Sequence, residues 1–261
     1  NQRVRQNILN AGIYAQLQTK LFTGFELMAG LRLDNATYFN KGNFSQLVYD
    51  ELGLRTDNGL STFQIQPRVQ ITWDFNDKHT DILRIGGGIF ASDINNYAMI
   101  NNMVFDGTKV MSVDIKNTEE EPDIVPTPDF IGYRKDPSTA PGIDLLNNPK
   151  YADKAVPTIN MNSKDAKVPV VYKANISYTH FFSDRLKMSV SGYMTLGRNN
   201  YMYIDRNMVD DPYFRLSAEG NRGIYVPAST IGKDGTLDWM EGRKSTKVGR
   251  VLELVSEGKV N

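Results

Sequence analysis

The chain has 261 residues, enough for one large domain or two small ones. Its 30 basic and 30 acidic residues balance, so no charge excess favours nucleic acid or an anionic surface as a partner. The absence of cysteine excludes a disulfide scaffold and a Cys-ligated zinc site. No apolar run approaches the roughly 18 residues of a transmembrane helix. No signal-peptide core opens the chain, so we expect a cytosolic protein or a mature or excised piece.

Strict alternation of apolar and polar residues predicts three pairs of β-strands. We expect hairpins at about 8–34, 62–92 and 169–204, each closed by a turn of only a few residues. The clearest strand is 62–75, TFQIQPRVQITWDF, in which every second residue is apolar. A last, less regular strand is predicted at 248–255.

Long connections at about 39–61, 93–168 and 205–247 separate these hairpins and are rich in Asn, Asp, Pro and Gly. Structureless loops of such length are uncommon in compact soluble domains. Short and long connections therefore alternate, and one end of the sheet is predicted to be elaborate. The best helical segment is NPKYADKA at 148–155, which has an asparagine N-cap and a proline at its first helical position.

Strand length and aromatic placement favour a membrane. The predicted strands run to about 9 to 14 residues, whereas globular strands average about five or six and a tilted transmembrane strand needs about 9 to 11. Aromatic residues gather at each short turn, as in the interfacial girdle of an outer-membrane barrel. They are Phe22, Phe25, Trp73, Phe75, Phe181 and Phe182. We therefore expect an all-β fold: part of an antiparallel transmembrane β-barrel with short periplasmic turns and long extracellular loops.

Three stretches resemble hairpins of TonB-dependent outer-membrane receptors, and together they cover roughly half of the residues. The G-x-Y-x-Q … G-x-R-x-D hairpin of that family resembles AGIYAQLQTKLFTGFELMAGLRLDNATY. The hairpin with P-R and R-x-G-x-G-x-F resembles QPRVQITWDFNDKHTDILRIGGGIFAS. The hairpin ending in R-N-N of the large Oar-like receptors is similar to VYKANISYTHFFSDRLKMSVSGYMTLGRNNYMYIDRN.

The resemblance implies a 22-stranded barrel in the outer membrane of a Gram-negative bacterium. A plug domain would close it, and the TonB complex would energise uptake of a scarce nutrient, oligosaccharide or peptide. This chain shows no plug and no TonB box, and seven predicted strands cannot close even the smallest barrel of about eight. We therefore expect an internal piece of a barrel that contacts outer-membrane lipid.

Polar residues between the apolar ones are expected to face the lumen and the plug. They are Arg32, Gln64, Gln66, Arg68, Gln70, Arg84 and Asn175. The glycines at 86–88 lack the lysine and helix start of a phosphate loop, and in a filled barrel they could make room for the plug. Ligand contacts in the external loops are expected from Tyr97, Tyr213 and Trp239.

No catalytic set, metal site or cofactor is predicted, so we do not expect an enzyme. His79 and His180 lie in or beside short turns and are interpreted as structural. The acidic run EEEPD at 119–123 and the aspartates 205, 210 and 211 lack EF-hand spacing, and we expect solvated loops there. Pro67 removes a ladder hydrogen bond, which predicts a bulge or local break in its strand.

A second fold stays open at this point. A soluble secreted β-sandwich, serving as a glycan-binding module or adhesin, would bury Phe63, Ile65, Val69 and Ile71 between two sheets. Its glutamines would then face water.

Overall fold

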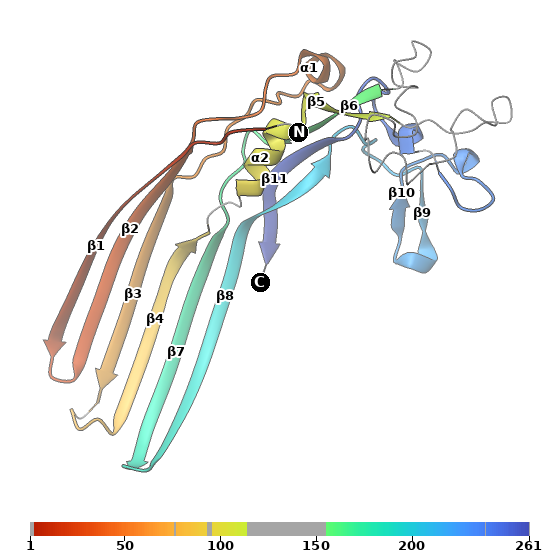
Figure 1. Cartoon of the computed structure of the whole chain (residues 1–261). Coiled ribbons are helices and arrows are strands. Elements are labelled where there is room, and N and C mark those ends of the chain that lie inside the picture. The colour runs from red at the N-terminus through yellow and green to blue at the C-terminus, as the bar shows by residue number, and fades with distance from the viewer. Residues whose placement is uncertain (1–2, 76, 93–95, 114–154, 238, 261) are drawn as a thin grey trace, which may run out of the picture.

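The computed structural model describes residues 3–75, 77–92, 96–113, 155–237 and 239–260 (Figure 1). One nine-stranded sheet dominates it, in the order β1-β2-β3-β4-β7-β8-β11-β6-β5. Its strands are β1 (Ile8–Phe22), β2 (Phe25–Tyr38), β3 (Gln64–Asp74), β4 (Asp81–Ala91), β5 (Asp106–Val113), β6 (Ala155–Asn162), β7 (Val170–Ser183), β8 (Leu186–Asp205) and β11 (Val251–Val260). The other elements are α1 (Gln46–Leu52), α2 (Asn96–Val104), the pair β9 (Phe214–Leu216) and β10 (Arg222–Ile224), and the 3-10 turns η2 (Ser217–Glu219), η3 (Ala228–Thr230) and η4 (Trp239–Gly242).

Three antiparallel hairpins form the long part of the sheet, which we call the hairpin sheet: β1–β2, β3–β4 and β7–β8. Their short turns all lie at one end, the turn end (Figure 1). Gly24 closes the first turn with φ of 75°, a left-handed conformation that glycine adopts without strain. A Cβ at this position would lie 2.2 Å from the carbonyl oxygen of Asp74. The predicted hairpins are therefore present, and β8 continues to Asp205.

The strand register divides the hairpin sheet into two chemically different faces. In-register residues of neighbouring strands share a face, and adjacent residues of one strand point to opposite faces. One row across four strands is entirely apolar: Leu27, Ile71, Ile85 and Ile176. The neighbouring row on the opposite face is Met28, Gln70, Gly86 and Asn175. We call the first the apolar face and the second the polar face.

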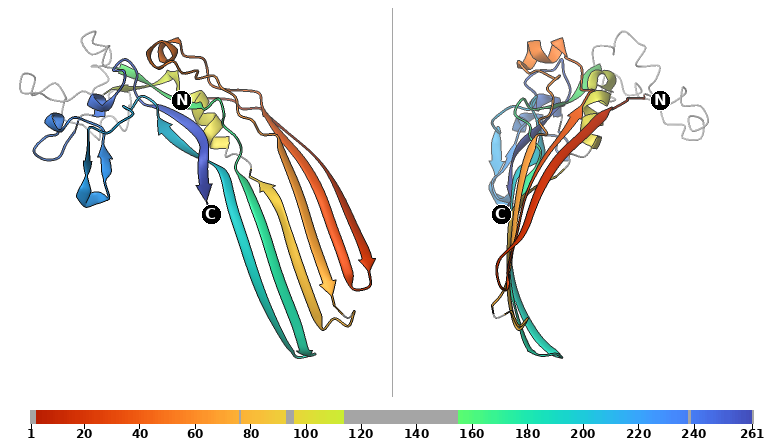
Figure 2. Two further views of the ribbon diagram at one scale, coloured as in Figure 1. Left: turned by 180° about the vertical axis from the view of Figure 1, so that it is seen from behind. Right: turned by 90° about the vertical axis from the view of Figure 1, so that its left-hand side faces the viewer.

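The apolar face is exposed. Ile13 exposes 69% of its surface, Ile176 50% and Met194 62%, and Figure 2 shows the hairpin sheet as a single bowed layer. All buried hydrophobic residues of the described chain lie elsewhere, in the segments beyond the other end of the strands. Soluble monomers rarely expose contiguous apolar patches of this extent. None of the helices in the described part of the chain is long and apolar enough to cross a membrane.

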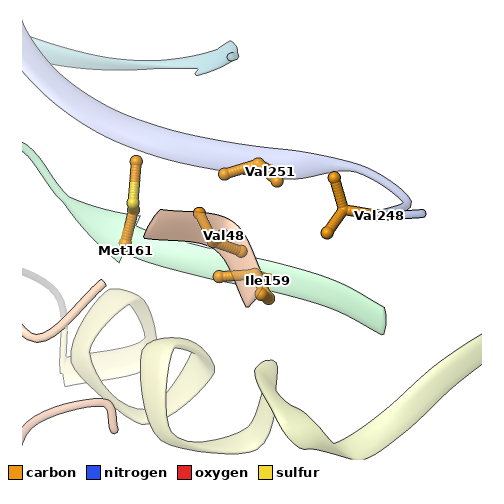
Figure 3. Packing of buried hydrophobic residues seen from close by; sticks show 5 residues of the cluster. All are labelled: Val48, Ile159, Met161, Val248 and Val251. Atoms are coloured by element: carbon orange, nitrogen blue, oxygen red, sulfur yellow. The ribbon is translucent and has the colours of Figure 1, made fainter. Parts of the chain in front are cut away.

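The core lies at the opposite end from the turns, in what we call the loop end: α1, α2, β5, β6, β11 and their connections. Val48 of α1 packs between β6 and β11 (Figure 3). Its neighbours in this buried cluster are Ile159, Met161, Val248 and Val251. A second cluster joins Ala98 of α2 to Ala166, Val168 and Leu254. The loop end thus buries apolar side chains as an ordinary soluble domain does.

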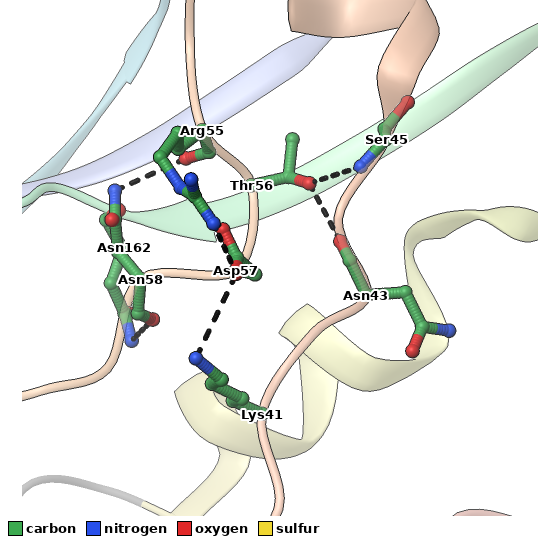
Figure 4. A network of polar contacts seen from close by, with 8 residues as sticks. All are labelled: Lys41, Asn43, Ser45, Arg55, Thr56, Asp57, Asn58 and Asn162. Atoms are coloured by element: carbon green, nitrogen blue, oxygen red, sulfur yellow. Dashed lines mark hydrogen bonds and ion pairs between the residues drawn. The ribbon is translucent and has the colours of Figure 1, made fainter.

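Polar contacts fasten the segment around α1 to the strands beneath it (Figure 4). The Thr56 hydroxyl donates to the Asn43 carbonyl at 2.6 Å and accepts from the Ser45 amide at 2.8 Å. Asn58 donates to the Asn162 carbonyl oxygen at 3.1 Å, and Asn162 donates back to the Asn58 carbonyl at 3.3 Å. The Thr56 bonds close the loop on itself, and the Asn58–Asn162 bonds fix it to β6.

The three long connections contain secondary structure. The segments 39–61 and 205–247 carry helices and strands, and the predicted 93–168 loop contributes α2, β5 and β6. The sheet therefore has nine strands, and it is not wholly antiparallel, because β11 runs parallel to β6. The last predicted strand begins at Val251 instead of 248. The helical segment expected at 148–155 lies outside the described residues except for Ala155, which begins β6.

Pro67 interrupts one ladder and leaves the other intact. The β2–β3 register runs through the Leu31–Pro67 pair without a bulge. The β3–β4 register begins only at Arg68, so the predicted local break is present on that side. Beyond it the Ala91 amide donates instead to the Gln66 side-chain oxygen, at 3.2 Å. A side chain thus supplies the acceptor where the backbone ladder has stopped.

Candidate functional site

The residues expected to face a lumen share one face of the sheet. Arg32 is in register with Gln66, Thr72 with Arg84, and Gly86 with both Gln70 and Asn175. Gln64 is in register with Asp34 and Arg68 with Gly30, so all seven predicted residues belong to the polar face. Whether that face borders a barrel lumen stays a prediction.

A hydrogen-bond network centred on Asp34 joins three strands at the loop side of this face. Arg32 donates twice to the Asp34 carboxylate, at 2.6 and 2.9 Å. Gln66 donates to the same carboxylate at 2.7 Å, and its own oxygen accepts from Arg68 at 3.4 Å. Gln66 is only 6% exposed, and these partners satisfy its amide. The network borders a cavity of 420 Å³ that Gln64 and Gly12 also line.

A second hollow, of 520 Å³, lies lower on the polar face. It is bordered by Gln16, Met28, Arg68, Phe90, Lys173 and Tyr193. The guanidinium carbon of Arg68 lies 4.6 Å from the centre of the Phe90 ring, and Lys173 Nζ lies 5.7 Å from it. Alternation places Phe90 and Lys173 on the polar face, but it gives no reason to single them out. Their meeting depends on the pairing of β4 with β7.

Aromatic rings form a nearly continuous line along the turn end. Phe22 stacks on Phe25 with ring centres 4.7 Å apart, and Phe25 lies 6.1 Å from Trp73. Trp73 meets Phe75 edge-on at 4.7 Å, and Phe75 lies 6.3 Å from Tyr178. The aromatic grouping expected at the first two turns is confirmed, and ring contacts link both to β7. At the third turn Phe182 contacts His180 at 4.4 Å, and Phe181 lies under Lys187.

Both histidines are bound to aspartates beside these turns. His79 Nδ1 lies 2.6 Å from Asp74, and His180 Nδ1 lies 2.6 Å from Asp81. The Tyr178 hydroxyl also donates to Asp81, at 2.5 Å. The contacts agree with a structural interpretation of the histidines, because His79 ties the second turn to β3 and His180 ties β7 to β4.

The three aromatic residues expected to contact ligand are separated in the loop region. Tyr97 lies in α2 and exposes 66% of its surface, and Tyr213 precedes β9 and exposes 54%. Trp239 begins η4. Figure 1 shows α2 beside the top of the sheet and the β9–β10 pair well away from it. The structure therefore does not bring Tyr97 and Tyr213 together into one site.

Two of the three aspartates at 205, 210 and 211 are paired with cations. Asp205 is buried with Arg243, whose guanidinium donates to it at 2.6 Å, so the solvated loop expected there was wrong for Asp205. Asp210 pairs with Lys244 at 2.6 Å and stays exposed. The run at 119–123 lies outside the described residues. Within the described ranges, no cluster of three or more potential metal-binding side chains occurs.

No family model matches the chain, and no curated protein matches its sequence. Among solved structures, the crystal structure of the siderophore receptor PirA from Pseudomonas aeruginosa aligns with a TM-score of 0.42 and 10% sequence identity. The alignment covers 97% of this chain, but the chain spans only 29% of that receptor. A likeness at this level does not establish a family. The narrower resemblance to Oar-like receptors has no support in these comparisons.

Proposed function

We propose that this chain forms part of the wall of an outer-membrane β-barrel receptor that takes up a nutrient with the help of TonB. One observation carries the proposal: a continuous apolar face, exposed to the outside, backs a polar face on the same strands. Lipid on one side and water on the other would satisfy both faces. Barrel closure would also pair the free edge of β1, which is otherwise a site for aggregation.

Aromatic spacing supports the same orientation. Phe63 and Trp73 lie ten residues apart beside and within β3, and so do Tyr172 and Phe182 on β7. At about 3.3 Å per residue and a tilt near 45°, ten residues rise about 23 Å. The apolar band of an outer-membrane barrel is about 25 Å tall between its aromatic girdles. The β3 and β7 segments thus carry aromatic residues at the spacing that two membrane interfaces require.

Among the described residues, no second sheet packs against the apolar face of the hairpin sheet, as the sandwich alternative would require. Its central requirement was burial of Phe63, Ile65 and Val69, which instead expose 60%, 56% and 46% of their surfaces. The two-stranded β9–β10 sheet belongs to the loop end and lies far from β3 (Figure 1). The exposure of these side chains therefore favours the barrel wall over the glycan-binding sandwich.

Val69 and Gln70 offer a matched test, because they are neighbours on opposite faces of β3. Expressed from the complete gene, Val69→Arg is expected to lose outer-membrane assembly, at a cost of about 2 to 4 kcal/mol near the bilayer midplane. Gln70→Arg should assemble normally. The measurement is the amount of heat-modifiable protein in the outer-membrane fraction. Normal assembly of Val69→Arg, or a native protein that stays soluble without detergent, would contradict the proposal.

The transport half of the proposal needs a separate experiment. A TonB-dependent receptor binds the periplasmic domain of TonB, so that domain should co-purify with the complete gene product from detergent extracts. Absence of this complex, with normal assembly of the barrel, would leave a barrel wall without a TonB-dependent function.

A further inference from the structure

The centre of the polar face has a floor of bare backbone. Two consecutive rows across β3, β4 and β7 have glycine in the middle: Arg68–Gly88–Lys173 and Gln70–Gly86–Asn175. The β2 residue in register with Arg68 is also a glycine, Gly30. Gly30 and Gly86 of this floor line the hollow of 520 Å³, whose volume is within the size range of small-molecule sites, about 300–1,000 Å³.

The glycines are required by the side chains that lean over them. A Cβ on Gly88 would lie 2.9 Å from the Pro67 carbonyl oxygen and 3.0 Å from Cγ of Arg68. A Cβ on Gly86 would lie 2.7 Å from the Asn175 side-chain oxygen. The missing Cβ atoms therefore let Arg68 and Asn175 approach the middle strand from its two sides. The result is a shallow seat with hydrogen-bond donors on both flanks.

An aromatic ring closes the seat toward the loop end. Phe90 follows Gly88 by two residues on β4, and its ring contacts both the Arg68 guanidinium and the Lys173 ammonium. Such cation–π contacts hold flexible cationic side chains in place. Arg84, in register with Thr72 and Ser177, lies on the same face toward the turn end. Three cations therefore surround two glycines.

These three cations lack anionic partners. In the part of the chain that the structure describes, no carboxylate lies within 4.0 Å of Arg68, Arg84 or Lys173. The carboxylates of the same face are already engaged: Glu26 accepts from Gln18, Asp34 from Arg32 and Gln66, and Asp74 from His79. Like charges held together repel one another. An incoming anion would relieve that repulsion.

We propose that this hollow binds a carboxylate-bearing small molecule. Arg68 and Lys173 would hold the carboxylate, Gln70 and Asn175 would donate further hydrogen bonds, and the apolar part of the ligand would lie against Phe90. A guanidinium recognises a carboxylate through paired, charge-assisted bonds. The inference rests on the proposed function in one respect. If the chain is part of a receptor wall, the solutes that bind this wall belong to the class of organic acids.

The test uses the complete gene product purified in detergent, with 4-fluorobenzoate as the probe and 4-fluorobenzamide as its uncharged counterpart. Binding is measured by ¹⁹F NMR titration. We expect the carboxylate to bind about tenfold more tightly than the amide, since charge-assisted bonds are the stronger ones. Arg68→Gln and Lys173→Gln should each weaken carboxylate binding about tenfold, and Phe90→Leu should weaken both probes.

Arg55→Gln is the control, because Arg55 lies at the loop end and is already paired with Asp57 at 2.8 Å. It should bind the carboxylate as the unaltered protein does. Equal affinity for the two probes, no binding of the carboxylate, or full binding by Arg68→Gln and Lys173→Gln would overturn the proposal. Heat-modifiable mobility is measured for each variant, so that a change in binding can be distinguished from failed assembly. Failed assembly would instead count against the barrel-wall proposal.

Discussion

Similar apolar side chains are buried in the loop end and exposed on the hairpin sheet. Ile159 of β6 is fully buried, whereas Ile13 of β1 exposes 69% of its surface. Both are isoleucines on β-strands of the same sheet. The loop end is stabilised by its own core, as in a soluble domain. The hairpin sheet has hydrogen bonds between strands, but nothing in the described part of the chain covers its apolar face, so its stability depends on what surrounds it.

This difference in burial indicates that the two regions of the chain need different environments. A single-layer sheet cannot bury either face on its own, and a stable sheet must pack against another layer. Lipid against the apolar face would supply that layer. The loop end needs no such partner, and Figure 2 shows α1 and β6 beyond the ends of the hairpin strands. Three experiments test this comparison, from the largest expected effect to the smallest.

Ile159→Ala should destabilise the loop end by about 2 to 5 kcal/mol, because it leaves a cavity in a packed core. Ile13→Ala removes the same atoms from the exposed face, where detergent chains can close the gap, so we expect a smaller loss. The chain offers one tryptophan per region as a reporter: Trp73 in β3 and Trp239 in η4. Denaturant unfolding in detergent, followed by fluorescence, measures both. Equal losses of unfolding free energy for the two substitutions would contradict the distinction between the regions.

Trp73→Leu tests the aromatic line at the turn end. Trp73 contacts Phe22, Phe25 and Phe75, and each aromatic pair contributes about 0.5–1.5 kcal/mol beyond its buried area. Leucine keeps apolar volume but loses the ring contacts, so we expect a loss of about 1 to 2 kcal/mol in denaturant unfolding. The remaining Trp239 reports the transition.

The control for that substitution is Phe39→Leu, at an exposed aromatic residue that follows β2 at the other end of the hairpin sheet. It should change the unfolding free energy by less than Trp73→Leu does. If the two substitutions cost the same, the ring contacts at the turn end add nothing to stability.

The smallest effect is expected from an ion pair at the loop end. Lys247 Nζ lies 2.6 Å from Glu51, and this hydrogen bond, with a second from Ser245, lowers the pKa of the Glu51 carboxyl. The hydrogen bond with Glu51 in turn raises the pKa of the Lys247 ammonium group. The glutamate contribution is complete above the ordinary pKa of about 4.3 and is lost as pH falls through the lower folded value. The lysine contribution is complete below about 10.4 and is lost as pH rises through the higher folded value.

Acid titration of the unfolding midpoint checks this sign. The unaltered protein should lose loop-end stability more steeply below about pH 4.3 than Glu51→Gln does. Identical acid slopes for the two proteins would show that the pair does not contribute. Because the pair is at the surface, the difference is expected to be small.

The alternating pattern determined the two faces and the three hairpins, because side-chain direction in a strand depends only on the position of each residue. The aromatic grouping at the first two turns followed for the same reason. The helix α1 was missed because it has only seven residues, and its stop depends on Gly53 in the left-handed conformation with φ of 68°. A short segment of this kind gives little periodicity to detect.

The sequence by itself therefore determined which residues share a face, since that is a local property of an extended backbone. Only the tertiary structure decided that β11 lies parallel to β6, and that Arg68 and Lys173 flank Gly88 on neighbouring strands. Strands β4 and β7 are separated by almost eighty residues of chain, and the register between them depends on long-range pairing that no local pattern encodes. The loop-end core has the same origin, because Val48 of α1 packs against residues more than a hundred positions away.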